Sequence, residues 1–515
     1  MLDYLWLVIG GGIASFISSM GIGANDVGNA FATSIGSKAL TVKSAVVIAS
    51  VFECTGAILM GSHVTNTIRK GIADYECFED DPELLMYGCF CVLLSVGAWL
   101  FLASYLEMPV STTHSCVGGM IGMTMVTGGS KCVIWYQATD SFPWVGGVSG
   151  IVISWFLSPV FSALISSSIF YMTRFTVLRR ENSFNISYKT FPLFVGLTIA
   201  LNTFFIIYKG GKGIGFDDLS ASGSFVIASG AGFLIGSVIT PFIPKMKQLV
   251  NNKFQQREND VNEETIECLN ELNEVGRVEK KKNKLQQCIA SIKKNINYNI
   301  DQIKVNEVKE IHDNSEKFDE KTEESFKYLQ IFTAVCASFS HGANDVANAI
   351  GPYAAIVSIY INDGELERNV DMDEYAYEIL GMGGVGISLG LFLYGYKIIR
   401  AIGVKLCCIT PSRGFSIELG SATVIIIGSR LGIPLSTTHC QVGATMGVAA
   451  LEDIKKCSGI NWKIVWRVFL GWIITLVVVG GTTGLLVAQG IYAPTKMIEE
   501  CPVIDYNETY SNNTN

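Results

Sequence analysis

Charged residues are scarce in this chain of 515 residues. They make up 16% of the sequence, against roughly 25% in a typical soluble domain. The net charge is −8, which gives no support for nucleic-acid binding, because that function requires a basic face. Apolar residues, by contrast, reach 49%, and there are 52 Gly. Because Gly is more frequent in membrane helices than in soluble ones, the composition predicts a membrane protein.

Metal-binding cysteine patterns are also missing. The 14 Cys are scattered, without CxxC pairs or Cys/His sets at zinc-site spacing. We interpret most of them as small buried apolar residues. The N-terminal stretch MLDYLWLVIGGGIASF lacks the basic region of a cleavable signal. We interpret this stretch as the first membrane helix, retained in the protein.

Long apolar stretches recur along the chain, and a helix needs about 20 such residues to cross the bilayer. Gly- and Ser-rich pieces lie between them, at 21–36, 109–127, 340–358 and 434–450. Short or broken apolar segments in corresponding halves point to a transporter binding site. The pattern predicts an all-α polytopic membrane protein with about 10–12 membrane segments, some of them broken or re-entrant.

The polar residues divide the chain into four parts. We predict an N-terminal membrane half (1–243), a polar cytoplasmic linker (244–325), a C-terminal membrane half (326–492) and a polar tail (493–515). The linker is rich in Lys, Glu and Asn, and we expect it to be largely disordered. The basic loop at 172–190 favours the cytoplasmic side. Asn507 and Asn512 stand in N-x-T sequons, which would be glycosylated only if the tail lies outside.

The two halves carry the same two motifs in the same order. GANDVGNA (23–30) recurs as GANDVANA (342–349), and PVSTTH (109–114) recurs as PLSTTH (434–439). The spacing is nearly kept, with 85 residues from Asp26 to Ser111 and 91 from Asp345 to Ser436. We interpret this as a duplication. Duplicated halves with broken helices are typical of secondary transporters, whose sites lie near the midplane between the repeats.

The first motif supplies a carboxylate among amides. Its polar residues are Asn25, Asp26 and Asn29 in one copy and Asn344, Asp345 and Asn348 in the other. On a helix they share one side. Carboxylate and amide oxygens suit a small hard cation, while the amides can also donate hydrogen bonds to an anion. Helix capping is the structural alternative, but an ionisable residue within an apolar stretch favours a functional role.

The second motif has the features of a helix start. Pro suits the first turn of a helix, and backbone N–H groups at a helix N-terminus bind anions together with the helix dipole. The hydroxyl residues Ser111, Thr112, Thr113, Ser436, Thr437 and Thr438 are therefore candidates for holding an oxyanion from two sides. Ordinary capping and hydroxyl–carbonyl bonds within a membrane helix are the alternative.

Two histidines and two further acids accompany the motifs. His114 and His439 follow the hydroxyl residues, and we favour hydrogen bonding within the bundle over a proton-linked role. Glu53 and Glu418 stand in apolar runs, where a structural carboxylate is the alternative to a functional one. An oxyanion beside several carboxylates requires cations, because like charges in a low dielectric repel strongly. The combination therefore indicates joint binding of an anion and a cation, as in a symporter.

At these motifs the chain resembles the PiT family of inorganic phosphate transporters. The resemblance rests on GANDVGNA and GANDVANA, on PVSTTH and PLSTTHC, and on TPSRGFSIELGSA (410–422), and it covers both membrane halves. It implies two inverted repeats and sodium- or proton-driven phosphate uptake. It also implies that Asn25, Asp26, Asn344 and Asp345 bind sodium and phosphate, that Ser111–Thr113 and Ser436–Thr438 hold phosphate and cation, and that Glu53 and Glu418 are needed for transport.

The function predicted is therefore a sodium-coupled phosphate symporter of the plasma membrane that works by alternating access. The alternatives are a proton-coupled phosphate or sulfate permease of the same fold, and a phosphate sensor or receptor. We predict no enzymatic activity, since no nucleophile–base–orienter set is present, and no cofactor besides the cotransported sodium. The predicted partners are inorganic phosphate, Na⁺ or H⁺ and the lipid bilayer, with a homodimer to be tested, and no nucleic acid.

Overall fold

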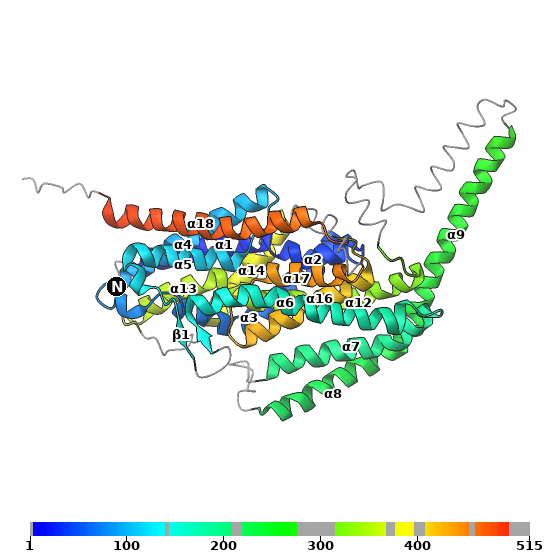
Figure 1. The fold of residues 1–515 in the computed structure, drawn as a ribbon, viewed down its shortest axis with the longest axis horizontal. Helices are drawn as coiled ribbons and strands as arrows, with labels where there is room; N and C mark the ends of the chain where they lie inside the picture. Colours follow the sequence, from blue (N-terminus) through cyan, green and yellow to red (C-terminus); the bar gives the residue numbers. More distant parts are fainter. Residues whose placement is uncertain are drawn as a thin grey trace, which may run out of the picture.

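The structure is a computed structural model that describes residues 4–139, 144–208, 219–274, 315–366, 376–395, 407–452 and 459–493. Within these ranges it is almost entirely α-helical (Figure 1). The helices of the first half are α1 (Leu5–Asn25), α2 (Val27–Gly36), α3 (Val42–Lys70), α4 (Pro82–Tyr105), α5 (Thr112–Thr127), α6 (Gly147–Thr173), α7 (Ser183–Ile207) and α8 (Ala221–Ile239). The second half has α12 (Glu320–Asp345), α13 (Ala347–Ile361), α14 (Ala376–Tyr394), α16 (Pro411–Arg430), α17 (Thr437–Ala450) and α18 (Trp462–Tyr492).

Short elements connect these helices. A π-helical turn, η4 (Arg174–Leu178), follows α6, and three 3₁₀ turns are η2 (Tyr75–Phe78), η3 (Ser130–Cys132) and η5 (Thr240–Phe242). The strands β1 (Gln137–Ala138) and β2 (Val145–Gly146) form a small antiparallel pair. Helix α9 (Ile243–Glu274) leads away from the bundle into the predicted linker. The rest of that linker up to residue 314, and the tail after residue 493, lie outside the described residues.

Eight helical segments in the described ranges are long and apolar enough to cross a membrane. Their outer faces carry large apolar side chains, such as Phe233 (80% exposed) and Leu485 (72% exposed). An apolar outer face is stable only against lipid, so the chain is a multi-pass membrane protein, as predicted. The polar helices α12 and α16 and the short helices α5, α13 and α17 are not among the eight, although they pack inside the same bundle.

The two halves interlock, and the major contacts of the repeated helices occur in matching pairs. Helix α1 packs against α4 and α14, and α12 packs in the same way against α16 and α3. Likewise α5 lies against α18 and α4, while α17 lies against α6 and α16. Each half therefore completes its packing with helices of the other half. The pairing is the one expected if α1–α6 and α12–α14 with α16–α18 descend from one repeat.

The bundle has two ends, which we name by their residues. The disulfide face carries the Cys77–Cys132 disulfide between η2 and η3. The linker face is the opposite end, where α6 ends and where α7 and α12 begin, with the hydroxyls of Ser183 and Thr322 2.8 Å apart. Helix α1 begins at the disulfide face, because Tyr4 donates a hydrogen bond to Glu83 at the start of α4. Thus α1 and α12 run in opposite directions.

Two of the cysteines form a disulfide, Cys77 with Cys132, and so lie outside the majority that we interpreted as small apolar residues. Sequence spacing could not have revealed this pairing, because 55 residues separate the two thiols and the fold brings them together. Other cysteines, including Cys89, Cys116 and Cys440, are free and buried, in agreement with that interpretation.

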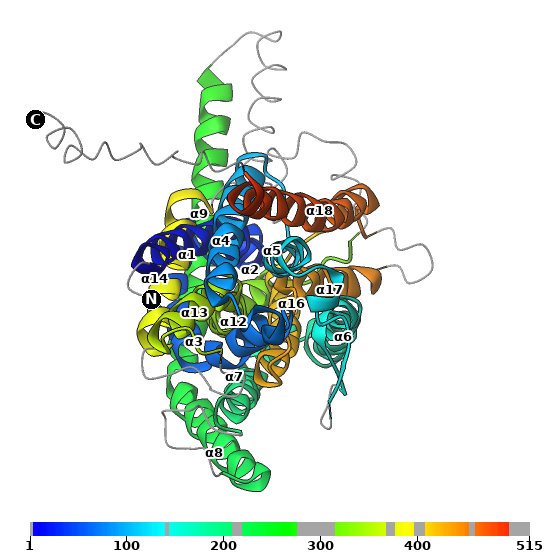
Figure 2. The same ribbon diagram turned by 90° about the vertical axis from the view of Figure 1, so that its left-hand side faces the viewer.

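Helices α7 and α8 form a hairpin at one side of the bundle, away from α18 (Figure 2). They approach closely at small residues. A Cβ atom on Gly232 would lie 2.3 Å from the Gly196 carbonyl oxygen, so only glycine fits there. Close contact through small residues is how membrane helices associate without a hydrophobic driving force between them.

Candidate functional site

The repeated acidic motif breaks two helices at the centre of the bundle. Helix α1 ends at Asn25 and α2 begins at Val27, so Asp26 stands at the break. In the second half α12 ends at Asp345 and α13 begins at Ala347. Both carboxylates are at most 1% exposed. The predicted broken helices are therefore present at both copies of the motif.

The repeated hydroxyl motif starts two helices at the same centre. Ser111 caps α5 by accepting a hydrogen bond from the His114 N–H, and Ser436 caps α17 through the His439 N–H in the same way. The two caps meet, because Ser436 Oγ donates to Ser111 Oγ at 2.9 Å. Helix α5 then runs toward the disulfide face, whereas α17 runs toward the linker face. Two positive helix ends therefore converge on one point from opposite sides.

The two carboxylates share the threonine hydroxyls of these helix starts. Asp26 accepts hydrogen bonds from Thr112 at 2.9 Å and Thr438 at 2.8 Å. Asp345 accepts one from Thr437 at 2.5 Å, and Thr437 also lies 3.2 Å from Asp26. The first repeat's acid thus contacts the second repeat's helix, so the site exists only where both halves meet. We call these five residues, together with the two capping serines and Thr113, the central site: Asp26, Asp345, Ser111, Thr112, Thr113, Ser436, Thr437 and Thr438.

The asparagines that precede the two acids hydrogen-bond to the backbone just before each helix start. Asn25 Oδ1 accepts a hydrogen bond from the Val110 N–H at 3.0 Å, and its Nδ2 donates to Ser104 at 3.2 Å. Asn344 makes the matching contact in the second half, where its Oδ1 accepts from the Leu435 N–H at 3.4 Å, and its Nδ2 also donates to the Leu435 carbonyl at 2.8 Å. Val110 and Leu435 each precede a capping serine. These contacts fix the backbone next to the capping serines, and the role of the two amides as ligands stays a prediction.

The second asparagine of the C-terminal copy reaches into the central site. Asn348 Nδ2 lies 3.0 Å from Asp345 Oδ1 and 3.2 Å from Thr112 Oγ1, and the Asn348 Oδ1 atom is buried without a hydrogen-bond partner. An orphaned buried amide oxygen is a ready ligand for a hard cation. Thr113 donates to the Leu435 carbonyl at 2.8 Å and accepts from Asn348 Nδ2 at 3.3 Å. The side chain of Asn29, the matching residue of the first copy, lies outside the described residues.

A histidine connects Glu53 to the central site. His341 Nδ1 lies 2.8 Å from Glu53 Oε2, and its Nε2 lies 2.8 Å from Asp345 Oδ2. The second contact has ion-pair distance but not the direction of a hydrogen bond, since Nε2 has no hydrogen-bond partner. Our sequence reasoning assigned no role to His341. Its position one turn before Asp345 on the same helix face was the available signal.

Glu418 lies in a separate polar cluster. Its carboxylate accepts hydrogen bonds from Thr33 at 2.7 Å, Ser34 at 2.5 Å and Thr333 at 2.7 Å, and from Gln330 Nε2 at 3.1 Å. The acid is fully buried. It joins α2 of the first half to α12 and α16 of the second. The hydroxyls that bond to Glu418 come from Thr33, Ser34 and Thr333, whereas those that bond to Asp26 and Asp345 come from the starts of α5 and α17.

The two motif histidines pack within the bundle. The His114 ring stacks on Trp155 with centroids 3.7 Å apart, and its Nδ1 lies 2.7 Å from Ser111 Oγ. His439 lies against Trp472 and contacts the Trp155 carbonyl at 3.0 Å. This arrangement agrees with the hydrogen-bonding role that we favoured. Through Ser111 the histidine also orients one of the two caps.

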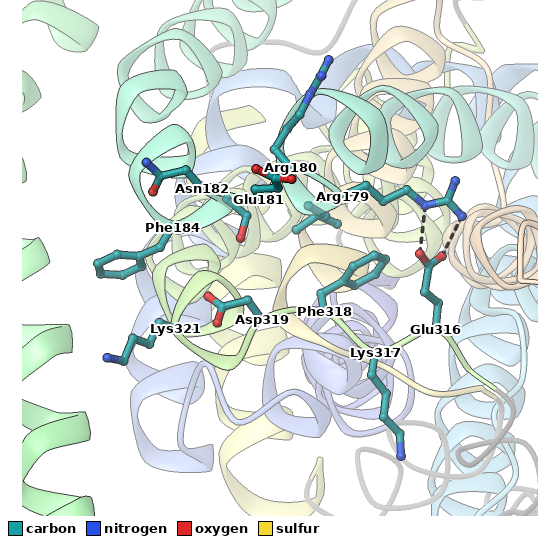
Figure 3. A pocket seen from close by; sticks show the side chains of 12 residues that line it. Arg179, Arg180, Glu181, Asn182, Phe184, Glu316, Lys317, Phe318, Asp319 and Lys321 are labelled. Carbon is teal, nitrogen blue, oxygen red and sulfur yellow. Dashed lines mark hydrogen bonds and ion pairs between the residues drawn. The ribbon is translucent and has the colours of Figure 1, made fainter.

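A pocket of about 630 Å³ lies at the linker face, far from these residues (Figure 3). Arg179 points toward Glu316, whereas Arg180, Lys317 and Lys321 point away from one another. The cations therefore do not converge on one anion. This pocket therefore lacks the converging anion-binding groups of the central site. Its residues instead hold the segment before α12 against the end of α6, through the ion pair of Arg179 with Glu316.

Eight apolar helical segments in the part of the chain that the structure describes surround a buried centre, where two carboxylates meet two helix N-termini, and this arrangement defines a multi-pass membrane transporter. Residues 22–483 match the phosphate transporter family, and the chain belongs to that family. The predicted resemblance is thereby confirmed. The relatives are transporters and permeases rather than enzymes.

Several relatives match along nearly their whole length. The phosphate-repressible phosphate permease pho-4 of Neurospora crassa is 30% identical, over 96% of this chain and 98% of the relative. The sodium-dependent phosphate transporter of Plasmodium falciparum is also 30% identical, over 96% of this chain and 99% of the relative. A solved structure described as the sodium-dependent phosphate transporter has a TM-score of 0.71 and 31% identity, covering 93% of this chain and 98% of that one.

Proposed function

We propose that this protein is a sodium-coupled inorganic phosphate symporter that works by alternating access. The observation that carries the proposal is the meeting of two helix N-termini, at Ser111 and Ser436, beside two buried carboxylates. The sodium-dependent relative and the similar solved structure support the choice of ion and substrate.

In this proposal, phosphate binding and sodium binding depend on each other. Phosphate would be held by the backbone N–H groups and hydroxyls at the starts of α5 and α17. Sodium would be held by the oxygens of Asp26, Asp345 and Asn348. Without the cation, the carboxylates would repel the anion, because the site is buried and its dielectric is low. Phosphate binding therefore requires sodium binding, which is the condition for coupled transport.

The remaining predicted ligands take supporting roles in this proposal. Asn25 and Asn344 position the helix starts through Val110 and Leu435. Glu418, with its ring of hydroxyls, would offer a further sodium site outside the central one. Glu53 would act on the central site through His341.

Alternating access follows from the opposed directions of the two halves in this proposal. Because α1 and α12 run in opposite directions, the two halves are related as inverted repeats would be. Such repeats can exchange conformations, so that the same central site faces each side in turn.

The test is radiolabelled phosphate uptake into proteoliposomes, with external sodium or choline, at pH 6 and pH 7.5. Uptake that requires sodium supports the symporter. Uptake that ignores sodium but follows an inward proton gradient would replace sodium with protons as the coupling ion. The absence of phosphate uptake under both gradients would contradict the proposal, and sulfate would then be the next substrate to test.

Proton coupling is the second candidate, because one observation favours it. His341 bridges Glu53 and Asp345, and a histidine between carboxylates can carry a proton where a sodium ion would otherwise compensate charge. His341→Gln separates the two candidates: a sodium symporter should keep sodium-dependent uptake of reduced affinity, whereas proton-driven uptake should be lost.

A further inference from the structure

The threonine hydroxyls of the central site already donate their protons to acceptors within the protein. They bond to Asp26, to Asp345 or to the Leu435 carbonyl, and they belong to Thr112, Thr113, Thr437 and Thr438. A hydroxyl has one proton to donate, so these groups cannot donate to a ligand without breaking a bond to the protein. An anion at the two helix starts therefore finds its donors among the backbone N–H groups there.

The protons of the two capping serines are used within the protein as well. Ser111 Oγ accepts hydrogen bonds from the His114 N–H at 3.3 Å and from Ser436 Oγ at 2.9 Å, which occupies both of its lone pairs. The Ser111 proton therefore goes to the remaining neighbour of this oxygen, His114 Nδ1, which lies 2.7 Å away. The three side chains form a hydrogen-bond relay that runs from Ser436 through Ser111 to His114.

The direction of this relay is set by the His114 ring, which accepts at Nδ1 and in its neutral form carries its proton on Nε2. The ring is buried and stacks on Trp155 with the centroids 3.7 Å apart. The corresponding histidine of the other repeat has the opposite arrangement. His439 Nδ1 lies 3.0 Å from the Trp155 carbonyl, which can only accept, so this ring donates from Nδ1 to the backbone of α6.

The relay leaves Ser436 Oγ with a position that can accept a hydrogen bond. This oxygen donates its proton to Ser111 and accepts from the His439 N–H at 3.3 Å, so one of its two lone pairs remains. Ser436 is buried, and it lies where the two positive helix ends converge. The site therefore combines backbone donors with a side-chain oxygen that can receive a proton from the ligand.

An anion that matches this arrangement needs unprotonated oxygens for the backbone N–H groups and one O–H group for Ser436. Hydrogen phosphate has both, because it keeps a proton at neutral pH. Sulfate keeps none, so one of its oxygens would face the Ser436 lone pair without a hydrogen bond. A site that is built to bond a substrate O–H group rejects an analogue without that group strongly.

We propose that His114 determines anion specificity: through Ser111 and Ser436 it makes the site accept a hydrogen bond from its anion, and the site thereby selects hydrogen phosphate over sulfate. His114 is a positioning residue in this role, because it acts through the two serines. The inference rests on the proposed function and names the feature of the site that separates the two anions.

The test measures binding to the purified full chain at saturating sodium, by displacement of radiolabelled phosphate at pH 8. The competitors are sulfate and fluorophosphate, which are dianions at this pH, as hydrogen phosphate is, but have no O–H group. Fluorophosphate also has nearly the shape of hydrogen phosphate. We expect the wild type to bind phosphate at least about 100-fold more tightly than either competitor. Equal binding of phosphate and fluorophosphate would overturn the proposal without the need for a variant.

Two variants interrupt the relay at different points. His114→Phe keeps an aromatic ring against Trp155 but removes the acceptor, so the relay reverses and Ser436 gains a proton to donate to the anion. Ser111→Ala removes the middle group and frees the same proton. In each variant the preference for phosphate over sulfate should fall about 10-fold. His439→Phe is the matched control, because the His439 ring bonds to a carbonyl rather than to a serine, and its preference should equal that of the wild type.

The possible results separate this inference from the function on which it rests. Weaker phosphate binding with an unchanged preference in both His114→Phe and Ser111→Ala is what a purely structural role predicts, and it would overturn the proposal. Selective phosphate binding without sodium-driven uptake would contradict the proposed function and support the role of His114. Sodium-driven phosphate uptake together with equal binding of sulfate would do the reverse.

Discussion

The central site contains two buried carboxylates, so a substitution of either one should have a large effect on transport. Asp26 and Asp345 are each less than 2% exposed and each accepts several hydrogen bonds from Thr hydroxyls or amides. Such bonds to a charged group contribute about 1.5–3 kcal/mol each. Removing the charge while keeping the shape therefore isolates the electrostatic role from packing.

We predict that Asp26→Asn or Asp345→Asn lowers sodium-dependent phosphate uptake by roughly 100-fold, because about 3 kcal/mol of interaction with the cation is lost. Uptake at saturating phosphate is measured alongside the amount of folded protein in the membrane. Normal uptake by either variant, at normal expression, would show that its carboxylate is not a ligand of the coupling ion.

At the helix starts, Ser436→Ala should raise the phosphate KM several-fold. The substitution removes both the hydrogen bond to Ser111 and the cap on the His439 N–H, and a lost cap costs about 1 kcal/mol. Thr445→Val is the matched control, because Thr445 is buried in the same helix and bonds only to the Gln441 carbonyl. Unchanged kinetics for Ser436→Ala would assign this hydroxyl to capping alone.

At this scale the sequence predicted the acids and hydroxyls of the central site but not how the side chains pair. The motif spacing could place Asn25 near Asp26, but not its bond to the Val110 backbone, which depends on how α1 packs against the chain before α5. His341 was missed for the same reason. Its two acidic neighbours are Asp345, on its own helix, and Glu53, which is 288 residues away in the chain.

Among the helices, the ion pairs of Glu316 at the linker face have the clearest consequence. Glu316 precedes α12 and accepts hydrogen bonds from Arg174 and from Arg179, the latter at 2.8 Å. Nearby, Arg413 pairs with Glu452 at 2.7 Å. Burial alone would raise the pKa of Glu316, but the bonds from Arg179 and Arg174 outweigh it and hold that pKa below its usual value.

A carboxyl with a lowered pKa stabilises the fold above its unfolded pKa, and that contribution disappears as the pH falls through the folded value. Glu316→Gln should therefore destabilise the protein at pH 7 by about 1 kcal/mol, discounted for partial exposure, and the difference from wild type should shrink below about pH 4. Thermal unfolding in detergent across this pH range tests the prediction. Glu320→Gln, at an exposed and longer ion pair, should have no effect.

The sequence also predicted the breaks in α1–α2 and α12–α13 and the starts of α5 and α17, because Gly, Pro and Ser act locally on the backbone. It did not predict that α12 begins at Glu320, six residues before our boundary at 326. Those residues are polar and resemble the linker, and only their contacts with α7 and α16 show that they belong to the bundle.

For the whole molecule, the disulfide closes a loop of 55 residues around α4 and α5. In the chain-entropy account, a disulfide that closes a loop of this length stabilises the folded protein by about 4 kcal/mol, although measured values are often smaller. Cys77→Ser should lower the unfolding temperature, and Cys132→Ser should lower it equally. Adding a reductant should destabilise the wild type but neither variant. Equal responses of all three proteins would show that the thiols are not joined.

The predicted plasma-membrane location and homodimer remain predictions at this scale. The division into four parts at 243, 325 and 492 also remains one, because most of the linker and tail lies outside the described residues. Composition was sufficient to identify these parts as polar, but it contains no information about what they contact.

The helix contacts between the two halves predict what happens when the chain is divided in two. Helix α5 packs on α18, and α17 packs on α6. The two halves on either side of the linker are therefore held together by helix contacts as well as by the peptide that joins them. A gene divided within 275–314, giving two separately translated polypeptides, should then yield a functional heterodimer when both pieces enter one membrane. Neither piece alone should bind phosphate, since each contributes one carboxylate and one helix start to a site that the other must complete.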